Sequence, residues 1–251
     1  MKTPSDGKQV KVKAAIQSGR HGAWRSYVDL VHGRQTPTRK VVGTELLTFL
    51  IGGLSGPAGL LLRKWLYPGL FGATGRNLLV GRNVTFRHWA KIRIGSNVVI
   101  DDNAVIDAKG ISNRGITIGD GVYIGRNTIV YCKNGDMDIG PGVNLSANCC
   151  LFSSNDLTLE PDIMVGAYSY ILSGGEYDPT DRETRFVDQS GLETKGPLTI
   201  GTNSWLGARV TVLDGANIGR HCVIGAGAVV TRPIPADSLA AGVPARVLKS
   251  I

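Results

Sequence analysis

An aliphatic residue recurs every six positions from about residue 80 to the end of this chain. The clearest stretch, residues 200–229, reads as five hexapeptides: IGTNSW, LGARVT, VLDGAN, IGRHCV and IGAGAV. A period of six fits neither the 3.6-residue turn of a helix nor the two-residue alternation of a strand. It fits a prism with three flat faces, in which each hexapeptide supplies a short strand and a turn. We therefore expect an all-β solenoid whose repeated aliphatic residues point inward.

The composition agrees with this architecture. The chain contains 34 glycines, and only 6% of its residues are aromatic. Glycine and asparagine at the turns supply backbone angles that β-branched residues resist. Stacked coils share one continuous core, so both ends of the solenoid need caps.

The N-terminal segment, residues 1–40, has a different character. It holds nine of the lysines and arginines but two of the acidic residues, so it carries nearly all of the formal net charge of +8. We predict a basic, flexible tail there, which favours polyanions such as anionic lipid or phosphorylated substrates. No nucleic-acid reading motif accompanies it, so nucleic acid is not an expected partner. No apolar signal sequence follows Met1, which with the four scattered cysteines favours a cytoplasmic location.

An apolar segment, residues 41–77, separates the tail from the repeats. From Leu46 to Leu62 it carries no charge, but several glycines and Pro57 interrupt it, so a straight transmembrane helix is a poor interpretation. One alternative is a pair of short helices lying on the inner face of the cell membrane, where Trp65 and its basic neighbours suit the headgroup layer. The other is a helical cap on the open end of the solenoid. One segment could do both.

Three interruptions break the repeat, at residues 107–115, 131–137 and 172–199. The last is the longest and is polar and charged. Loops that leave a rigid scaffold commonly carry function. We therefore expect the excursion at residues 172–199 to contribute to a functional site.

The repeats around this excursion carry specific motifs. PLTIGTNSWLGARVTVLDGANIG starts at Pro197, and GAGAVVTRPIPADSLAAGVPARVLK starts at Gly225. These stretches resemble the hexapeptide-repeat acyltransferase family, most closely its sugar and polysaccharide O-acetyltransferases. The resemblance covers residues 78–251 and implies a left-handed parallel β-helix with a C-terminal tail, assembled as a homotrimer. That hand departs from the usual right-handed crossover rule, so it rests on the resemblance alone.

The resemblance also implies a chemistry. Such enzymes transfer an acyl group, here most simply from acetyl-CoA, directly to a hydroxyl group without a metal ion. It implies that the pantetheine arm of coenzyme A passes the backbone at Ala208 and Ala226, and that Trp205 borders the reaction centre. The residues that it implies for the adenine and phosphate end are Thr231, Arg232, Arg246 and Lys249.

The catalytic base is the departure from the family pattern. Where the resemblance places a histidine, this chain has Glu176, and the excursion contains no histidine. A carboxylate is a weak base unless burial or a neighbouring charge raises its pKa. Glu176 could serve as the base, it could be a bystander in an enzyme that uses another residue, or catalysis could be lost.

These observations support two functions. The first is an O-acetyltransferase that modifies a sugar hydroxyl in surface polysaccharide or glycolipid assembly. The second is a non-catalytic trimeric scaffold of a polysaccharide-assembly complex. The four histidines are scattered and lack the spacing of the zinc-binding variety of this prism, so no metal site is expected.

Overall fold

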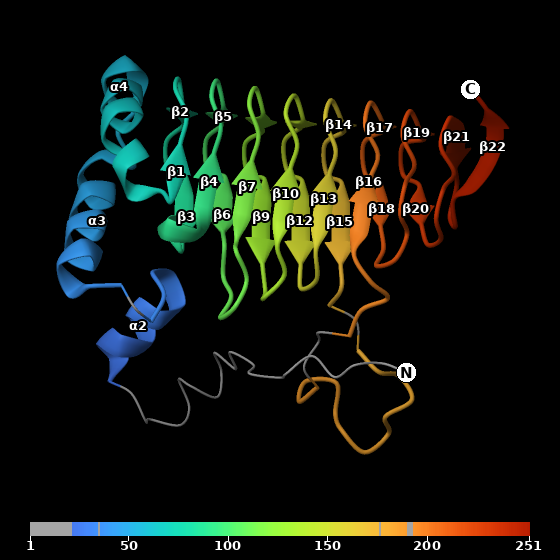
Figure 1. Cartoon of the computed structure of the whole chain (residues 1–251), viewed down its shortest axis with the longest axis horizontal. Coiled ribbons are helices and arrows are strands. Elements are labelled where there is room, and N and C mark those ends of the chain that lie inside the picture. The colour runs from blue at the N-terminus through green and yellow to red at the C-terminus, as the bar shows by residue number, and fades with distance from the viewer. Residues whose placement is uncertain (1–21, 35, 176, 190–192) are drawn as a thin grey trace.

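Three parallel sheets wind into a three-sided prism that runs the length of the molecule (Figure 1). The computed structural model describes residues 22–34, 36–175, 177–189 and 193–251. Successive strands step from face 1 to face 2 to face 3, and parallel neighbours in each sheet lie one coil apart along the axis; the last strand of the chain instead turns back antiparallel. The predicted all-β solenoid is confirmed.

Each face consists of short strands. Face 1 contains β1 (Ala73–Thr74), β4 (Ile92–Ile94), β7 (Ile116–Ile118), β10 (Met137–Ile139), β13 (Leu157–Leu159) and β16 (Leu198–Ile200). Face 2 contains β2 (Leu79–Val80), β5 (Val99–Ile100), β8 (Tyr123–Ile124), β11 (Asn144–Leu145), β14 (Met164–Val165), β17 (Trp205–Leu206), β19 (Val223–Ile224), β21 (Ser238–Ala241) and β22 (Arg246–Ser250). Face 3 contains β3 (Thr85–Arg87), β6 (Val105–Asp107), β9 (Ile129–Cys132), β12 (Cys150–Ser153), β15 (Tyr170–Ser173), β18 (Thr211–Val212) and β20 (Val229–Val230).

The sixfold repeat places its aliphatic residues in register inside the prism. Ile94 pairs with Ile118, Ile118 with Ile139, and Ile139 with Leu159, and all four are buried. The coils therefore contribute inward side chains from all three faces to a continuous apolar column. Because each coil contacts only its neighbours, the stability of the prism grows coil by coil.

The turns explain the distribution of asparagine and glycine. Three residues after an inward aliphatic residue the backbone repeatedly adopts positive φ, as at Asn97, Asn103, Asn127 and Gly142. Glycine and asparagine occupy this left-handed region most readily. The repeat thus encodes both the strand and the turn that follows it.

Helices cover the open N-terminal end of the prism, at the left of Figure 1. They are α2 (Ala23–Val31), α3 (Thr38–Ile51) and α4 (Gly56–Leu66), followed by the short 3-10 helices η1 (Pro68–Leu70) and η2 (Trp89–Lys91). Tyr67 and Phe71 from this region pack against Phe86 and Trp89 of the first coil, with ring centroids 4.9 to 6.3 Å apart. These helices therefore pack on the first coil and cover this end of the solenoid.

Arg63 on α4 fixes the cap through backbone carbonyls. Its side chain is buried and donates to the carbonyl oxygens of Val80, Ile51 and Leu54 at 2.8 to 2.9 Å. Burial lowers the pKa of this guanidinium group. One charged side chain thus joins the end of β2 to the C-terminal end of α3 and to the loop that follows it.

Helix α2 lies inside the segment for which we predict a flexible tail, so that prediction is wrong for residues 23–31. Val28 is buried, and the backbone N–H of His88 donates to the carbonyl oxygen of Val31 at 2.7 Å. These contacts attach α2 to the first coil. None of the helices in the described part of the chain is long and apolar enough to cross a membrane.

Candidate functional site: two corners of the prism

The corner between face 2 and face 3, called the regular corner below, has the same four-residue turn in coil after coil. Ala208 and Ala226 occupy equivalent positions in successive turns there and are exposed. The glycines before them pack tightly, because a side chain on Gly207 would lie 2.7 Å from the backbone nitrogen of Ala226. Small residues therefore leave the backbone of this corner open to an extended ligand.

The corner between face 3 and face 1, called the insertion corner below, varies from coil to coil. Equivalent residues of successive coils show this variation. Trp205 pairs with Val223 three hexapeptides later, whereas the coil between Met164 and its partner Trp205 also contains the long excursion. All three predicted interruptions lie between a face 3 strand and the next face 1 strand. The excursion leaves after β15, which ends at Ser173, and returns at β16, which begins at Leu198.

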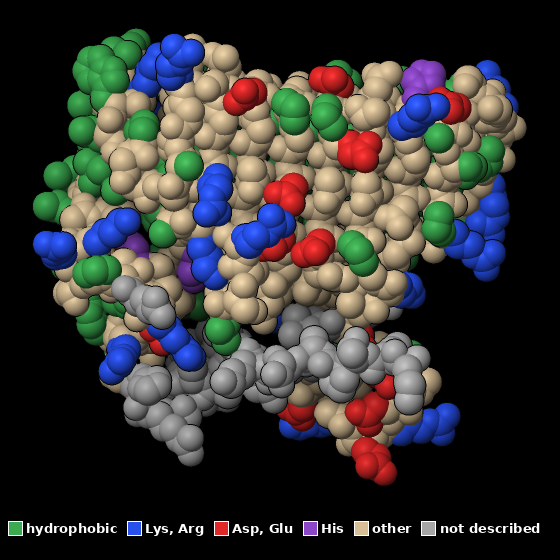
Figure 2. Space-filling model, in the orientation of Figure 1, with side chains coloured by type: hydrophobic (Ala, Val, Ile, Leu, Met, Phe, Trp, Pro, Cys, Tyr) green, Lys and Arg blue, Asp and Glu red, His purple; other side chains and the backbone are tan. Residues whose placement is uncertain are grey.

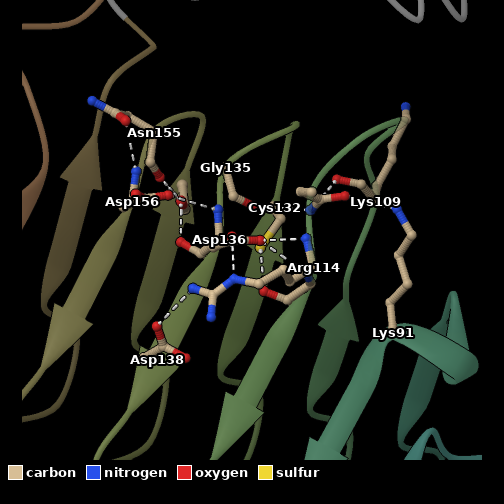
Figure 3. Close-up of polar contacts among 12 residues, drawn as sticks. Lys91, Lys109, Arg114, Cys132, Gly135, Asp136, Asp138, Asn155 and Asp156 are labelled. Carbon is tan, nitrogen blue, oxygen red and sulfur yellow. Dashed lines mark hydrogen bonds and ion pairs between the residues drawn. The ribbon is translucent and has the colours of Figure 1, made fainter.

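Polar side chains compensate for the irregular backbone at the insertion corner (Figure 3). Asp136 accepts hydrogen bonds from the backbone N–H groups of Arg114 and Gly115 at 2.6 and 3.0 Å, and from Arg114 Nε at 2.8 Å. Arg114 also reaches Asp138 at 3.3 Å. Burial alone would raise the pKa of Asp136, but these hydrogen bonds outweigh it and hold the pKa below its usual value.

Asp214 holds both ends of the excursion. Its carboxylate is 1% exposed and accepts from the backbone N–H of Gly174 at 2.5 Å, where the excursion begins. It also accepts from Thr194 Oγ1 at 3.2 Å and from the backbone N–H of Lys195 at 2.5 Å, where the excursion returns. Asp214 follows the face 3 strand β18, one coil above β15. A single buried carboxylate thus closes the base of the loop.

Glu176, the predicted base, lies outside the described residues. The residue before it, Gly175, is described. A side chain on Gly175, at φ +82°, would lie 2.6 Å from the ring of Phe152, so the backbone passes directly over this aromatic residue. Phe152 in turn packs on Tyr131 with ring centroids 4.8 Å apart, and burial raises the pKa of Tyr131 to about 12. The excursion therefore starts next to packed aromatic side chains of face 3.

The other predicted residues are distributed over several parts of the prism. Trp205 points outward from face 2 and is 54% exposed. Thr231 and Arg232 follow β20 at the insertion corner of the last coils, and both are exposed. Arg246 and Lys249 lie on β22, the exposed strand that pairs antiparallel with β21. Within one chain, Trp205 and the two alanines lie near one another at the regular corner, whereas the excursion leaves from the insertion corner.

Each histidine in the described ranges is paired with a carboxylate. His32 lies 2.8 Å from Glu45, His88 lies 3.1 Å from Asp107, and His221 lies 3.2 Å from Asp237. His88 belongs to the coil of β3, and three face 3 strands separate that coil from β15. In the described part of the chain, no group of three or more histidine, cysteine or acidic side chains could hold a metal ion.

Asp214 is a functional candidate that its hexapeptide, VLDGAN, does not reveal. Nothing in a single hexapeptide indicates that two distant backbone amides converge on one turn residue. Its position in the sequence could have indicated this role, because Asp214 lies in the first turn from face 3 to face 1 after the excursion. A carboxylate there is well placed to satisfy backbone N–H groups that an irregular loop leaves unpaired.

Comparisons with known proteins agree with the repeat. The family described as bacterial transferase hexapeptide (six repeats) matches residues 197–232. The chain is 34% identical over 122 residues to a Saccharomyces cerevisiae protein named "Putative acetyltransferase", a match covering 48% of this chain and 60% of that protein. It is 32% identical over 136 residues to a Mycobacterium tuberculosis protein named "Probable acetyltransferase", covering 54% of this chain and 44% of the other. The chain thus matches about half the length of these relatives.

A solved structure shares the fold. It is a mutant of AntD, an N-acyltransferase from Bacillus cereus, in complex with dTDP-4-amino-4,6-dideoxyglucose and Coenzyme A. The superposition covers 72% of this chain and 84% of AntD with a TM-score of 0.50 and 17% identity. The hexapeptide period, the three-faced prism and these relatives agree: residues 197–232 match the bacterial transferase hexapeptide family, and the chain is similar in sequence to proteins named acetyltransferases.

Proposed function

We propose that this chain is a coenzyme A-dependent O-acetyltransferase that acts on a sugar hydroxyl. The observation that carries the proposal is the pairing of two features in the coils around residues 197–232. Small exposed residues line the regular corner, and a clamped excursion leaves the insertion corner at the neighbouring level. The acetyltransferase names of the sequence relatives support the reaction type.

We further propose that the site forms between copies of the chain in a homotrimer. The outward side chains of the three faces differ. Those of faces 2 and 3 are mostly apolar, as at Val99, Tyr123, Met164, Trp205, Val223, Val105, Ile129, Cys150, Tyr170 and Val229, whereas face 1 presents Arg93, Thr117, Asp138, Thr158 and Thr199. Apolar rows on both sides of the regular corner suit burial against another copy. The excursion of one copy can then reach the regular corner of its neighbour, which a single prism does not allow.

In this proposal coenzyme A lies along the regular corner. The pantetheine arm contacts the backbone at Ala226 and Ala208, and its thioester ends near Trp205. The phosphate end takes exposed residues of the C-terminal coils: Arg246 and Lys249 on β22, and Thr231 and Arg232 across β20 at the insertion corner. Cations at that end suit the phosphates, since exposed arginine and lysine bind phosphate oxygens with charge-assisted hydrogen bonds.

The chemistry is direct transfer. Glu176 takes the proton from the acceptor hydroxyl while the oxygen attacks the thioester carbonyl, and the coenzyme A thiolate leaves. A carboxylate is an efficient base when its pKa lies near neutrality, and a low-dielectric setting raises the pKa of a carboxyl group. Holding donor and acceptor together supplies a large part of the rate.

The test is coenzyme A binding by calorimetry, followed by thiol release from acetyl-CoA with sugar acceptors. We expect Glu176→Gln to bind coenzyme A as wild type does and to transfer acetyl at least about 100-fold more slowly. The matched control is Glu183→Gln, an exposed glutamate in the same excursion, which should behave as wild type. Transfer that survives Glu176→Gln removes this residue from the mechanism. A protein that binds no coenzyme A at millimolar concentration is instead the non-catalytic scaffold.

We also propose that the cap binds an anionic membrane surface. Figure 2 shows apolar side chains gathered at the cap end of the prism, with basic side chains around them. Phe49 on α3 is 84% exposed and Trp65 on α4 is 68% exposed, and Lys64 and Arg39 lie on the same helices. Such a surface suits the interface layer of a bilayer with acidic headgroups. This would bring the site close to lipid-linked glycans of surface polysaccharide or glycolipid assembly.

Sedimentation with vesicles tests the membrane proposal. We expect wild type to pellet with phosphatidylglycerol-containing vesicles and to stay in the supernatant with phosphatidylcholine alone. The double variant Phe49→Ser, Trp65→Ser should lose pelleting, and its fold should persist because both side chains are exposed. Equal pelleting of the variant would exclude this surface. Loss of the trimer in the variant would show that the cap instead contacts another copy.

A further inference from the structure

Two side chains depart from the turn pattern of the regular corner. Apart from glycine, asparagine, aspartate and histidine, Tyr168 and Arg209 are the only described residues with positive φ, at 62° and 59°. The equivalent turn position is Asn127 or Asn148 in coils on one side and Gly227 on the other. Tyr168 and Arg209 occupy consecutive coils, since β14 pairs with β17.

This placement is unfavourable for folding. A bulky side chain in the left-handed region is a backbone outlier, and such outliers gather at functional sites where the surrounding structure maintains them. Nothing in the turn itself requires these residues, because asparagine and glycine make the same turn in adjacent coils. A role of the side chains explains why they are present at this corner.

The two side chains contact each other and extend into solvent. The guanidinium carbon of Arg209 lies 5.9 Å from the centroid of the Tyr168 ring, and Tyr168 is 61% exposed. Arg126 and Arg82, which lie at the same corner, pair with Asp101 and Asp102 at 3.2 and 3.0 Å. Arg209 has no such partner, as no carboxylate of the described residues lies within 4.0 Å of its nitrogens.

The position of the pair relative to the proposed cofactor path indicates its ligand. Arg209 directly follows Ala208, and Tyr168 lies one coil further from the C-terminus, next to Ala167. A pantetheine arm that enters from the C-terminal coils and passes Ala226 and then Ala208 ends at this level. The next ligand along the corner is therefore the acceptor.

The geometry points to Tyr168 and Arg209 as the acceptor-binding platform, and to a sugar that carries an anionic group as the acceptor. This inference rests on the proposed function and deepens it. The Tyr168 ring offers a flat apolar surface to the face of a sugar ring. The guanidinium group of Arg209, which has no carboxylate partner among the described residues, binds a carboxylate or a phosphate, which it can contact with two parallel N–H donors.

The first arm of the test is stability, which needs no activity. Tyr168→Asn and Arg209→Asn place the residue of the neighbouring coils in the same turn. We expect each variant to raise the unfolding midpoint by about 2 to 4 °C, because backbone strain is relieved. The control Asn103→Gly, at the same corner far from the site, should leave the midpoint nearly unchanged. A lower midpoint in the two asparagine variants would assign the side chains to folding and overturn the inference.

The second arm is acceptor selectivity. Acetyl transfer is measured to methyl glucoside, methyl glucuronide and glucose 6-phosphate, of which the last two separate carboxylate from phosphate recognition. We expect wild type to prefer a charged acceptor, and Arg209→Asn to raise its KM at least about tenfold while the KM for acetyl-CoA stays within about twofold. Arg209→Lys should retain part of the preference. Equal use of neutral and charged acceptors by wild type would overturn the inference.

Two further readouts separate the alternatives. Sedimentation equilibrium of the asparagine variants should give the wild-type mass, and a smaller mass would make the pair an interface contact. Coenzyme A binding is measured first on wild type. A chain that binds coenzyme A and transfers acetyl without any effect of Arg209→Asn refutes the platform alone, whereas a chain that binds no coenzyme A refutes the proposed function.

Discussion

The regular corner and the insertion corner are built from the same repeat but differ in turn length and in how the backbone is held. At the regular corner every turn has the same length, and a residue with positive φ within each turn reverses the chain locally. At the insertion corner the length varies, and buried or half-buried carboxylates hold the backbone instead, as Asp214 and Asp136 do. A rigid corner can present a surface for an extended ligand, while a variable corner can grow a loop without disturbing the prism. Function in this chain is expected to need both.

The largest expected effect comes from the insertion corner and tests whether the excursion must be held at its base for activity. Asp214→Asn replaces the carboxylate that accepts hydrogen bonds from two backbone N–H groups and one hydroxyl group. The base of the excursion should therefore loosen. We expect acetyl transfer to fall about 100-fold, since small misplacements of reacting groups have effects of that size. Coenzyme A affinity should stay within about threefold.

Thiol release, calorimetry and limited proteolysis of the excursion measure these effects. Asp188→Asn, an exposed carboxylate within the loop, is the matched control and should change none of them. Unchanged transfer by Asp214→Asn would mean that the loop needs no clamp for activity.

The next effect tests the rigid corner alone. Ala208→Tyr places a large side chain where the pantetheine arm is proposed to pass, so we expect the Kd for coenzyme A to rise about tenfold or more. Ala147→Tyr makes the same change two coils away and should leave the Kd unchanged. Because Ala208 is exposed, thermal unfolding of the variant should match wild type. Equal affinity in both variants would move the cofactor away from this corner.

A smaller effect concerns the turns themselves. Asn103, at φ 60°, is exposed at the regular corner, and Asn103→Ala should destabilise the protein by about 1 to 2 kcal/mol because alanine resists the left-handed region. Asn103→Gly should cost close to nothing. Chemical denaturation measures both. If alanine and glycine have equal effects, the local turn conformation does not account for the asparagine repeat.

The smallest effect is the pH dependence at the insertion corner. The folded pKa of Asp136 is held below its unfolded value, so this group contributes stability above the unfolded pKa of about 3.9. That contribution is lost as the pH falls through the lower folded value. Asp136→Asn should therefore destabilise the protein at pH 7 by on the order of 1 kcal/mol, and the gap from wild type should shrink toward pH 2. Denaturation at both pH values tests this, and a constant gap would contradict it.

The sequence predicted the prism well because one period determines strands, turns and inward residues together. Ile94, Ile118 and Ile139 could be assigned to the core before any coordinates were known. The cap was harder to predict, because the packing of Tyr67 and Phe71 against Trp89 joins segments with no shared pattern. The beginning of α2 lies in a basic segment whose few apolar residues did not indicate a helix.

The candidate site shows the same limit. Its cofactor residues follow the repeat, so resemblance could name them, and they remain predictions. Asp214 escaped notice because its partners, Gly174 and Lys195, are brought to it by the closure of a loop rather than by periodicity. Tyr168 and Arg209 could be recognised only once the backbone showed which turn positions require positive φ. The hexapeptide pattern predicts neither which residues a loop brings together nor which turn positions have positive φ.

The reversed direction of β22 has a consequence for growth of the molecule. A stack of identical parallel coils exposes matching strand edges at both ends, and such edges can recruit further copies into fibres. Here β22 turns back along β21 and presents a short strand with exposed charged residues, Arg246 and Lys249, while the helices cover the opposite end. An incoming copy therefore finds no parallel edge to extend on face 2. The same C-terminal strand that is proposed to hold the phosphates also closes this sheet.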